Sequence, residues 1–140
     1  MATTIRSLTV ADSANAIALW HEADLVVPWN DPAADYARAI AAESAGILGA
    51  FDDADRLVAT AMVGYDGHRG WIYYLATDPS LRRSGVGLKI VRAAEDWLRE
   101  RGAPKVQLMV RNSNETAVGF YAALGYEVSD VKVLGKRFDT

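Results

Sequence analysis

Cysteine is absent from the 140-residue sequence, and only two histidines are present, His21 and His68. Without cysteine there is no disulfide framework, no cysteine-ligated zinc or iron–sulfur cluster and no cysteine nucleophile. Two histidines leave little for a histidine-rich site, so we expect no bound metal. No apolar run approaches the length of a membrane span, and the first residues lack the apolar core of a signal peptide. We therefore expect a cytoplasmic protein with no membrane partner.

The sequence also lacks an excess of positive charge. It has fifteen Lys and Arg residues and eighteen Asp and Glu residues, for a net charge of -3. Nucleic-acid binders usually carry a basic surface, so this balance argues against a nucleic-acid partner. The hydrophobic fraction of 51% is ordinary for a globular protein. A length of 140 residues is typical of one compact domain. We therefore expect a single domain over residues 1–140.

The hydrophobic periodicity alternates between strand and helix patterns along the chain. The expected strands cover residues 4–9, 47–51, 57–65, 71–77 and 105–110, with one or two more within 131–138. The expected helices run from Asp12-Ser13 to about 24, from Asp31-Pro32 to about 44–46, over 86–101 and over 114–124. This order predicts a mixed α/β fold. The strand, helix and strand from 71 to 110 should form a right-handed parallel crossover.

Capping and turn residues set several of these boundaries. Asp31 before Pro32 has the pattern of an N-cap followed by a proline in the first turn. Asp66-Gly67 is a strong hairpin signal between two strands. The apolar stripe of the helix after Asp31 is expected to consist of Ala33, Tyr36, Ala37 and Ile40.

A glycine-containing segment, Arg82-Arg83-Ser84-Gly85-Val86-Gly87, lies between a predicted strand and a long predicted helix. Backbone N–H groups and the dipole at a helix start favour anions. Gly85 and Gly87 allow a phosphate to approach the backbone closely, and the two arginines add positive charge. The segment is neither a P-loop nor a dinucleotide-binding fingerprint, because no Gly-Lys-Ser/Thr follows and the third glycine is missing. The alternative is an ordinary loop with solvated arginines.

The segment from Val110 to Tyr126 carries a second pattern. Asn112 or Asn114 can cap the helix that follows. Tyr121 lies on the apolar stripe of that helix, so it is either a core aromatic or a functional hydroxyl.

Together the two segments resemble the GNAT superfamily of N-acetyltransferases. Arg82, Gly85 and Gly87 fit its cofactor motif, Arg/Gln-x-x-Gly-x-Gly/Ala. The later helix fits Asn-x-x-Ala-x-x-x-Tyr-x-x-x-Gly-Phe through Asn114, Ala117, Tyr121 and Gly125, with Tyr126 in place of Phe. The strand end Leu75-Ala76-Thr77-Asp78-Pro79 also fits, and segments 28–32 and 65–70 resemble the bacterial YpeA-type branch.

The resemblance implies a mixed central sheet with splayed parallel strands and flanking helices, and acetyl-CoA as co-substrate. The arm of acetyl-CoA would pair with the backbone of one splayed strand, and the pyrophosphate would sit on the glycine-containing loop. The implied cofactor-binding residues are Leu75, Ala76, Thr77, Arg82, Arg83, Ser84, Gly85, Val86, Gly87, Leu88 and Asn114. Tyr121 matches the family's general acid for the departing thiolate.

The resemblance does not supply a general base. Some relatives that acetylate ribosomal proteins carry Glu where this chain has Met109, which cannot take a proton. Asp66, His68, Glu22 and Asp31 are candidates elsewhere, although Asp66 is more simply explained by the Asp-Gly turn.

The acceptor is expected to be a primary amine, on a small molecule or a protein, that attacks acetyl-CoA directly in a ternary complex. The residues considered for its site are Trp29, Tyr65, Asp66, His68 and Arg69. The alternative is an acyl-CoA-binding or interaction module without turnover. Many members of the family are homodimers, and the sequence leaves the oligomeric state open.

Overall fold

The computed structural model describes residues 2–139 and divides the chain into two compact units, Met1–Leu108 and Met109–Thr140. The first unit holds all five strands of the sheet, three α-helices and two short 3-10 helices, η1 (Val10–Asp12) and η2 (Pro79–Leu81). The strands are β1 (Thr4–Ser7), β2 (Ala45–Phe51), β3 (Leu57–Tyr65), β4 (Gly70–Thr77) and β5 (Val106–Leu108). The helices are α1 (Ser13–Glu22), α2 (Pro32–Ala41) and α3 (Val86–Glu100).

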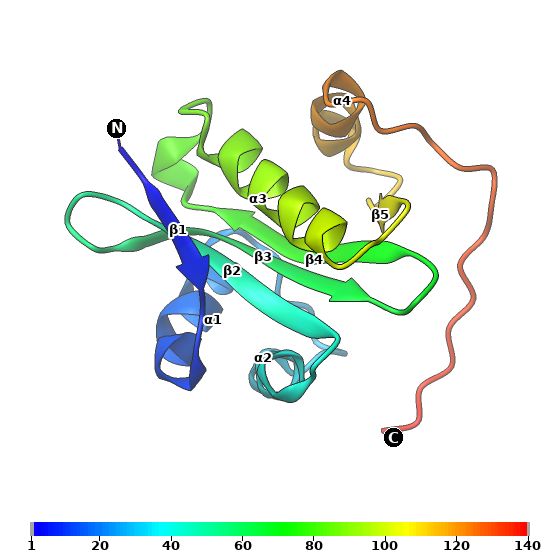
Figure 1. Cartoon of the computed structure of the whole chain (residues 1–140), viewed down its shortest axis with the longest axis horizontal. Coiled ribbons are helices and arrows are strands. Elements are labelled where there is room, and N and C mark those ends of the chain that lie inside the picture. The colour runs from blue at the N-terminus through cyan, green and yellow to red at the C-terminus, as the bar shows by residue number, and fades with distance from the viewer. Residues whose placement is uncertain (1, 140) are drawn as a thin grey trace. The chain divides into compact units, whose positions relative to one another are not determined.

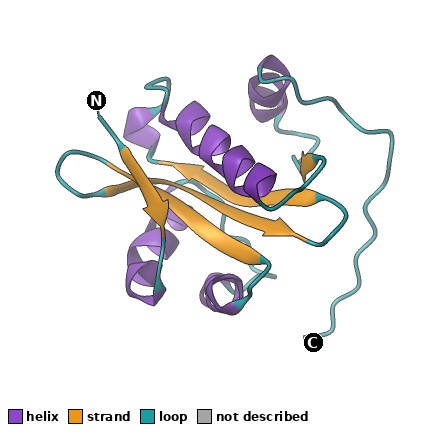
Figure 2. Cartoon of the chain, viewed as in Figure 1, coloured by secondary structure: helices purple, strands orange, loops and turns teal. Residues whose placement is uncertain are grey.

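The five strands form one sheet in the order β1-β2-β3-β4-β5 (Figures 1 and 2). The first three pairings are antiparallel, and β4 pairs with β5 in parallel. The chain passes from β4 to β5 through α3, as the predicted crossover requires. The expected mixed α/β fold with a parallel pair of strands is confirmed, and the structure places that pair at one edge of the sheet.

Helices cover both faces of this sheet (Figure 1). On one face, α3 contributes four buried apolar residues to a core shared with β2, β3 and β4: Val86, Ile90, Ala94 and Leu98. On the other face, α1 and α2 enclose a second core around the fully buried Trp20 and the buried Tyr36. The central strands are therefore covered on both faces. Because β4 pairs with the buried strand β3, that pairing holds the backbone of β4 along one edge.

The start of α2 follows the predicted capping pattern. Asp31 accepts a hydrogen bond from the backbone N–H of Ala34 at 3.1 Å, and Pro32 occupies the first turn. The helix ends at Ala41, earlier than predicted. The predicted stripe is wrong at Ala33 and Ala37, which are exposed, because the helix turns Tyr36 and Ala39 toward the core.

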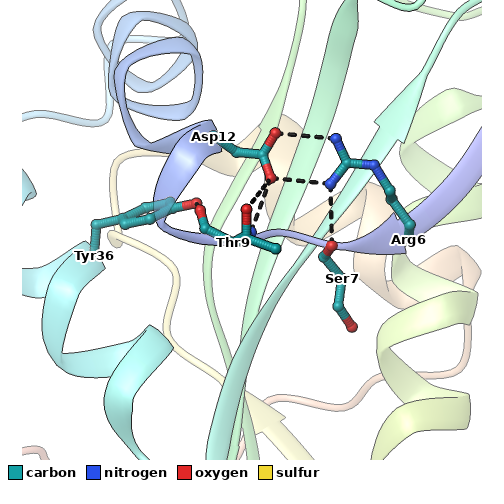
Figure 3. A network of polar contacts seen from close by, with 5 residues as sticks. All are labelled: Arg6, Ser7, Thr9, Asp12 and Tyr36. Carbon is teal, nitrogen blue, oxygen red and sulfur yellow. Dashed lines mark hydrogen bonds and ion pairs between the residues drawn. The ribbon is translucent and has the colours of Figure 1, made fainter.

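Asp12 precedes α1 as predicted, but its carboxylate is used elsewhere (Figure 3). It accepts hydrogen bonds from Arg6 Nη1 at 2.9 Å and from the backbone N–H of Thr9 at 2.8 Å. The Tyr36 hydroxyl donates to the Thr9 carbonyl at 2.6 Å. These bonds join β1, η1 and α2 within the first unit.

The second unit contains α4 (Glu115–Ala123) and the chain that follows it. Asn114 caps α4 by accepting from the backbone N–H of Ala117 at 3.1 Å. The strands predicted within 131–138 are wrong, because residues 131–139 form no strand in the described structure. A strand requires a neighbouring ladder, and here Val131, Val133 and Leu134 are exposed.

Candidate active site

The middle of β4 contains a β-bulge. Thr60 pairs with Ala76 and Met62 pairs with Tyr73, so Ala61 of β3 faces two residues of β4, Tyr74 and Leu75. Tyr74 has a φ of 47°, in the left-handed region that side-chain-bearing residues rarely adopt. A bulge bends its strand and interrupts the ladder.

From Tyr73, just before the bulge, to the end of the strand, one edge of β4 is open within the first unit. The pairing of β4 with β5 covers only Gly70–Ile72, opposite Val106–Leu108. The remaining residues of the strand, Tyr73–Thr77, have no ladder partner on that side among residues 2–108. Leu75 and Ala76 direct their side chains into the two cores, so the backbone is what this edge offers to a ligand.

The predicted phosphate loop directly follows this edge. Asp78 accepts from the backbone N–H of Ser80 at 2.9 Å and starts η2. Two left-handed residues, Arg83 with φ 66° and Gly85 with φ 89°, then lead into α3. A Cβ on Gly85 would meet no atom within 4 Å, so the space in front of this glycine is open. The first turn of α3 therefore presents backbone N–H groups beside an open glycine, as an anion site requires. The Val86 N–H donates to Ser84 Oγ at 3.4 Å, whereas those of Gly87 and Leu88 precede the first bond of the helix ladder, from the Lys89 N–H to the Gly85 carbonyl.

The side chains of this loop separate into two groups. Arg82, Arg83 and Ser84 are exposed, and neither arginine forms an ion pair within residues 2–139. Val86 is buried in the core, and Gly87 and Leu88 are half-buried. The first group can contact a phosphate through side chains, and the second only through backbone.

A hollow of about 80 Å³ at the start of α3 is lined by Thr3, Ser84, Gly85, Val86 and Lys89. Lys89 Nζ donates to the Thr3 carbonyl at 2.5 Å and lies at 2.7 Å from the Thr3 hydroxyl. The sequence analysis did not assign Lys89 to the site. Its position four residues after Gly85, one helical turn later, is the signal that could have found it.

Four of the residues considered for the acceptor site lie at the other end of β4, where β3 turns into it. The Asp66 carboxylate accepts from the backbone N–H groups of His68 at 2.8 Å and Arg69 at 2.7 Å, and these bonds lower its pKa. That is the arrangement of a turn residue. Arg69 Nη1 donates to the His68 carbonyl at 3.0 Å, and Tyr65 packs against the core. A role for these residues in acceptor binding stays a prediction.

Trp29 lies in the connection between α1 and α2 and is 56% exposed. A large exposed aromatic side chain is unusual for packing alone and is common at binding surfaces. Its role in acceptor binding stays a prediction.

In the second unit, Tyr121 belongs to a small aromatic cluster on and after α4. Its ring centroid lies 5.2 Å from that of Phe120 and 5.5 Å from that of Tyr126, both edge to face. Burial raises the pKa of Tyr121 to about 12. The hydroxyl therefore stays protonated, and able to donate, over the whole physiological range. Met109, at the position where some relatives carry Glu, is 53% exposed.

Residues 2–139 offer neither a membrane-spanning helix nor a cluster of metal ligands. No described helix has the length and apolar character needed to cross a membrane. No three His, Asp or Glu side chains in this part of the chain are grouped as metal ligands.

Comparison with known proteins identifies the family. The sequence profile of the acetyltransferase (GNAT) family matches residues 14–126. "Acetyltransferase YE1169" of Yersinia enterocolitica is 39% identical over 133 residues, which cover 95% of this chain and 94% of that protein.

Solved structures agree on the fold. The ribosomal-protein-S18-alanine N-acetyltransferase of Escherichia coli has a TM-score of 0.78 at 26% identity, covering 91% of this chain and 80% of that one. The aminoglycoside acetyltransferase AAC(6')-Iy, in complex with the bisubstrate analogue CoA-S-monomethyl-acetylneamine, has a TM-score of 0.83 at 16% identity, covering 98% and 99%. With its sheet, its bulged strand and its glycine-containing loop before α3, the chain belongs to the GNAT family of acetyltransferases.

Proposed function

We propose that this acetyltransferase uses acetyl-CoA and transfers the acetyl group to a primary amine by direct attack, with both substrates bound at once. The observation that carries the proposal is the sequence of features along one stretch of the first unit. An open β4 edge, Tyr73–Thr77, leads through η2 directly into an exposed glycine-containing turn at the start of α3. An extended arm ending in a pyrophosphate fits that order, strand edge first and anion site second.

The residues along this stretch suit the parts of acetyl-CoA. The backbone of Leu75, Ala76 and Thr77 is available for main-chain hydrogen bonds to the amides of the arm. Gly85, Val86, Gly87 and Leu88 offer backbone N–H groups to the pyrophosphate, and Arg82, Arg83 and Ser84 offer polar side chains. Lys89 adds a cation at the edge of the same hollow.

The chemistry requires little from the side chains. The amine nitrogen attacks the thioester carbonyl carbon, a C–N bond forms, the C–S bond breaks, and the amine proton passes to solvent or a base. The amine must be neutral to attack, and a free lysine has a pKa of about 10.4. Holding the two substrates in contact supplies much of the rate. A backbone N–H directed at the carbonyl oxygen stabilises the developing charge.

We further propose that Asn114 contacts the cofactor and that Tyr121 donates its proton, or a hydrogen bond, to the departing thiolate. The support is the match of α4 to the family motif and the protonated state of Tyr121. Both units would then belong to one domain, because the matched family segment, residues 14–126, runs across the boundary between Leu108 and Met109. The acceptor residues, the cytoplasmic location and the homodimer stay predictions.

Related proteins support an amine as the acceptor. One solved relative is named for acetylating an alanine of a ribosomal protein, and another is named an aminoglycoside N-acetyltransferase. Both names describe N-acetylation. Met109 argues against the base found in some ribosomal-protein enzymes, so a reactive amine or a base elsewhere is required.

The test is release of free thiol from acetyl-CoA in the presence of a panel of amines, with thermal stability measured in parallel. A hundredfold excess of acetyl-CoA over its dissociation constant should stabilise the fold by about 2.7 kcal/mol. Gly87→Val should abolish that gain. Binding without thiol release from any amine would favour the module without turnover, and a Gly87→Val variant with the wild-type gain would show that the phosphate site is misplaced.

A further inference from the structure

The bulge in β4 is held by a buried chain of hydrogen bonds that the proposed function has not used. Trp20 Nε1 donates to Thr60 Oγ1 at 2.9 Å, and Thr60 Oγ1 donates to the Tyr74 carbonyl at 3.0 Å. Both Trp20 and Thr60 are 0% exposed. Among the buried residues of the described structure, Thr60 is the one with a polar side chain that is neither aromatic nor part of the hydrophobic core.

The direction of this chain is fixed by the chemistry of its members. An indole N–H can only donate and a carbonyl can only accept. The Thr60 hydroxyl must therefore accept from Trp20 and give its own hydrogen to Tyr74. A threonine hydroxyl that is free to rotate elsewhere has a single useful orientation here.

The Tyr74 side chain is held as firmly as its carbonyl. Its ring stacks on the Trp20 ring with centroids 3.9 Å apart and planes 16° apart. Its hydroxyl donates to Asp35 Oδ2 at 2.7 Å, and Arg38 Nη2 lies 2.7 Å from Asp35 Oδ1. These contacts come from three elements, α1, α2 and β3. They oppose the relaxation of Tyr74 out of its left-handed conformation, which an L residue adopts only where its surroundings enforce it.

The orientation of the Tyr74 carbonyl determines that of the next amide. No described peptide bond is cis, so the Leu75 N–H points opposite to the Tyr74 carbonyl. The carbonyl faces Thr60 of β3. The Leu75 N–H is therefore directed away from β3, on the side where β4 is open.

Resting on the proposed function, we propose that Thr60 and Tyr74, held by Trp20 and Asp35, are positioning residues that direct the Leu75 N–H at the acetyl carbonyl oxygen of bound acetyl-CoA. The four side chains do not touch the substrate. They act by fixing one peptide plane, whose N–H stabilises the negative charge on the oxygen as the amine attacks. Donors at such positions are effective only when they are already oriented before the reaction.

The experiment compares Thr60→Val, which keeps the shape of the side chain and removes the hydroxyl, with Thr60→Ser, which keeps the hydroxyl. Ile47→Val is the matched control, because Ile47 is 1% exposed in the same core and takes no part in the hydrogen bonds. We expect kcat to fall by about tenfold to a hundredfold in Thr60→Val, with acetyl-CoA affinity changed much less. Thr60→Ser should recover most of kcat. Ile47→Val should lower the melting temperature and leave kcat unchanged.

Nuclear magnetic resonance makes the test independent of turnover. In Thr60→Val the carbonyl carbon resonance of Tyr74 should move, and acetyl-CoA should no longer shift the Leu75 amide proton as it does in wild type and in Thr60→Ser. Should Thr60→Val not fold, Tyr74→Phe serves instead. This substitution removes the hydrogen bond to Asp35 and keeps the stacking on Trp20. It should lower kcat as well, but by a smaller factor than Thr60→Val does.

Three results would overturn the inference: an unchanged Tyr74 carbonyl resonance, a Leu75 amide indifferent to acetyl-CoA in wild type, or a kcat in the Thr60 or Tyr74 variant no lower than in Ile47→Val. If wild type binds acetyl-CoA and releases no thiol with any amine, the proposed function fails on its own. The two resonances then still decide the orientation of the Leu75 amide.

Discussion

Gly70 of β4 lies so close to Leu98 of α3 that a Cβ on Gly70 would sit 2.8 Å from both Leu98 Cδ atoms. Leu98 is 2% exposed, so it has little room to withdraw. This contact seats the C-terminal half of α3 on the first residue of the β4–β5 pairing, and it explains why a glycine occupies an otherwise regular strand position.

Gly70→Ala should therefore lower the free energy of unfolding by about 1 to 2 kcal/mol, because overpacking forces a buried side chain out of place. Gly64→Ala is the control from the neighbouring strand, where a Cβ would find its nearest atom at 3.8 Å, an ordinary contact. That variant should be as stable as wild type or slightly more stable. Chemical denaturation of the three proteins measures both values, and equal losses in the two variants would show that α3 sits differently on the sheet.

Acid stability should depend on Asp12. The side-chain hydrogen bond from Arg6, with further bonds from Thr9, lowers the pKa of Asp12 from its ordinary 3.8 to about 2. A lowered pKa means that the stabilisation is complete above pH 3.8 and is lost as the pH falls toward 2. Because the Arg6 side chain is 50% exposed, solvent screening leaves about 1 kcal/mol of the effect.

Asp12→Asn should accordingly be less stable than wild type at pH 7 and equally stable near pH 2. The control is Asp96→Asn, which removes a carboxylate from an ion pair with both partners 68% exposed and should change stability by less than about 0.5 kcal/mol. Urea denaturation at several pH values provides the comparison. A constant difference between wild type and Asp12→Asn from pH 7 to pH 2 would contradict the linkage to Asp12.

The regular parts of the fold could be predicted because their residues repeat with a clear period. The strand predicted over 57–65 and the helix predicted over 86–101 are confirmed as β3 and α3, and the Asp31 cap is confirmed as well. The segment 131–138 is also predicted to contain strands and forms none among the described residues, because a sequence pattern describes one segment and a ladder requires two.

The sequence predicts a candidate site only as far as that site rests on residue types. The glycine-containing loop and the α4 motif carry their own signals. The bulge carries none, since nothing in Tyr73-Tyr74-Leu75 marks a left-handed residue. Thr60 reads as one small polar residue in a buried strand, and only the folded structure brings it to Trp20, forty positions earlier in the chain.

Removal of positive charge at the loop should weaken acetyl-CoA binding. Arg82 is exposed with an ordinary backbone conformation, so Arg82→Ala changes charge without changing the turn. A charge-assisted bond to phosphate contributes about 1.5 to 3 kcal/mol, so the dissociation constant should rise by about tenfold or more. Titration calorimetry measures it, with Arg92→Ala as the control, because Arg92 is an exposed residue of α3 beyond the lining of the hollow. An equal weakening in both variants would indicate a general effect of net charge.

Tyr121→Phe tests the proposed general acid, since it keeps the ring in its aromatic cluster and removes only the hydroxyl. Loss of a general acid costs about a hundredfold to ten-thousandfold in rate, so kcat should fall while acetyl-CoA affinity and melting temperature hardly change. Tyr126→Phe is the control, because it makes the same change on a ring whose centroid lies 5.5 Å from that of Tyr121, and because it installs the residue of the family motif. A kcat for Tyr121→Phe equal to that of the control, with chemistry limiting the rate, would make Tyr121 a packing residue.

The pH dependence separates the two ways in which Tyr121 could act. Its pKa of about 12 lies well above that of a free thiol, about 8.5. Full proton transfer from Tyr121 to a free thiolate is therefore unfavourable, and more so than transfer from an ordinary phenol with a pKa of about 10. Transfer must then accompany the breaking of the C–S bond, or the hydroxyl must act as a hydrogen-bond donor. In either case the hydroxyl stays protonated until the pH approaches 12, so the rate of wild type should show no decline due to Tyr121 below about pH 11. Tyr121→Phe should lower the whole pH–rate profile without changing its shape. A wild-type decline near pH 10 that vanishes in Tyr121→Phe would show that the hydroxyl titrates as a solvated phenol, outside the buried cluster described for it.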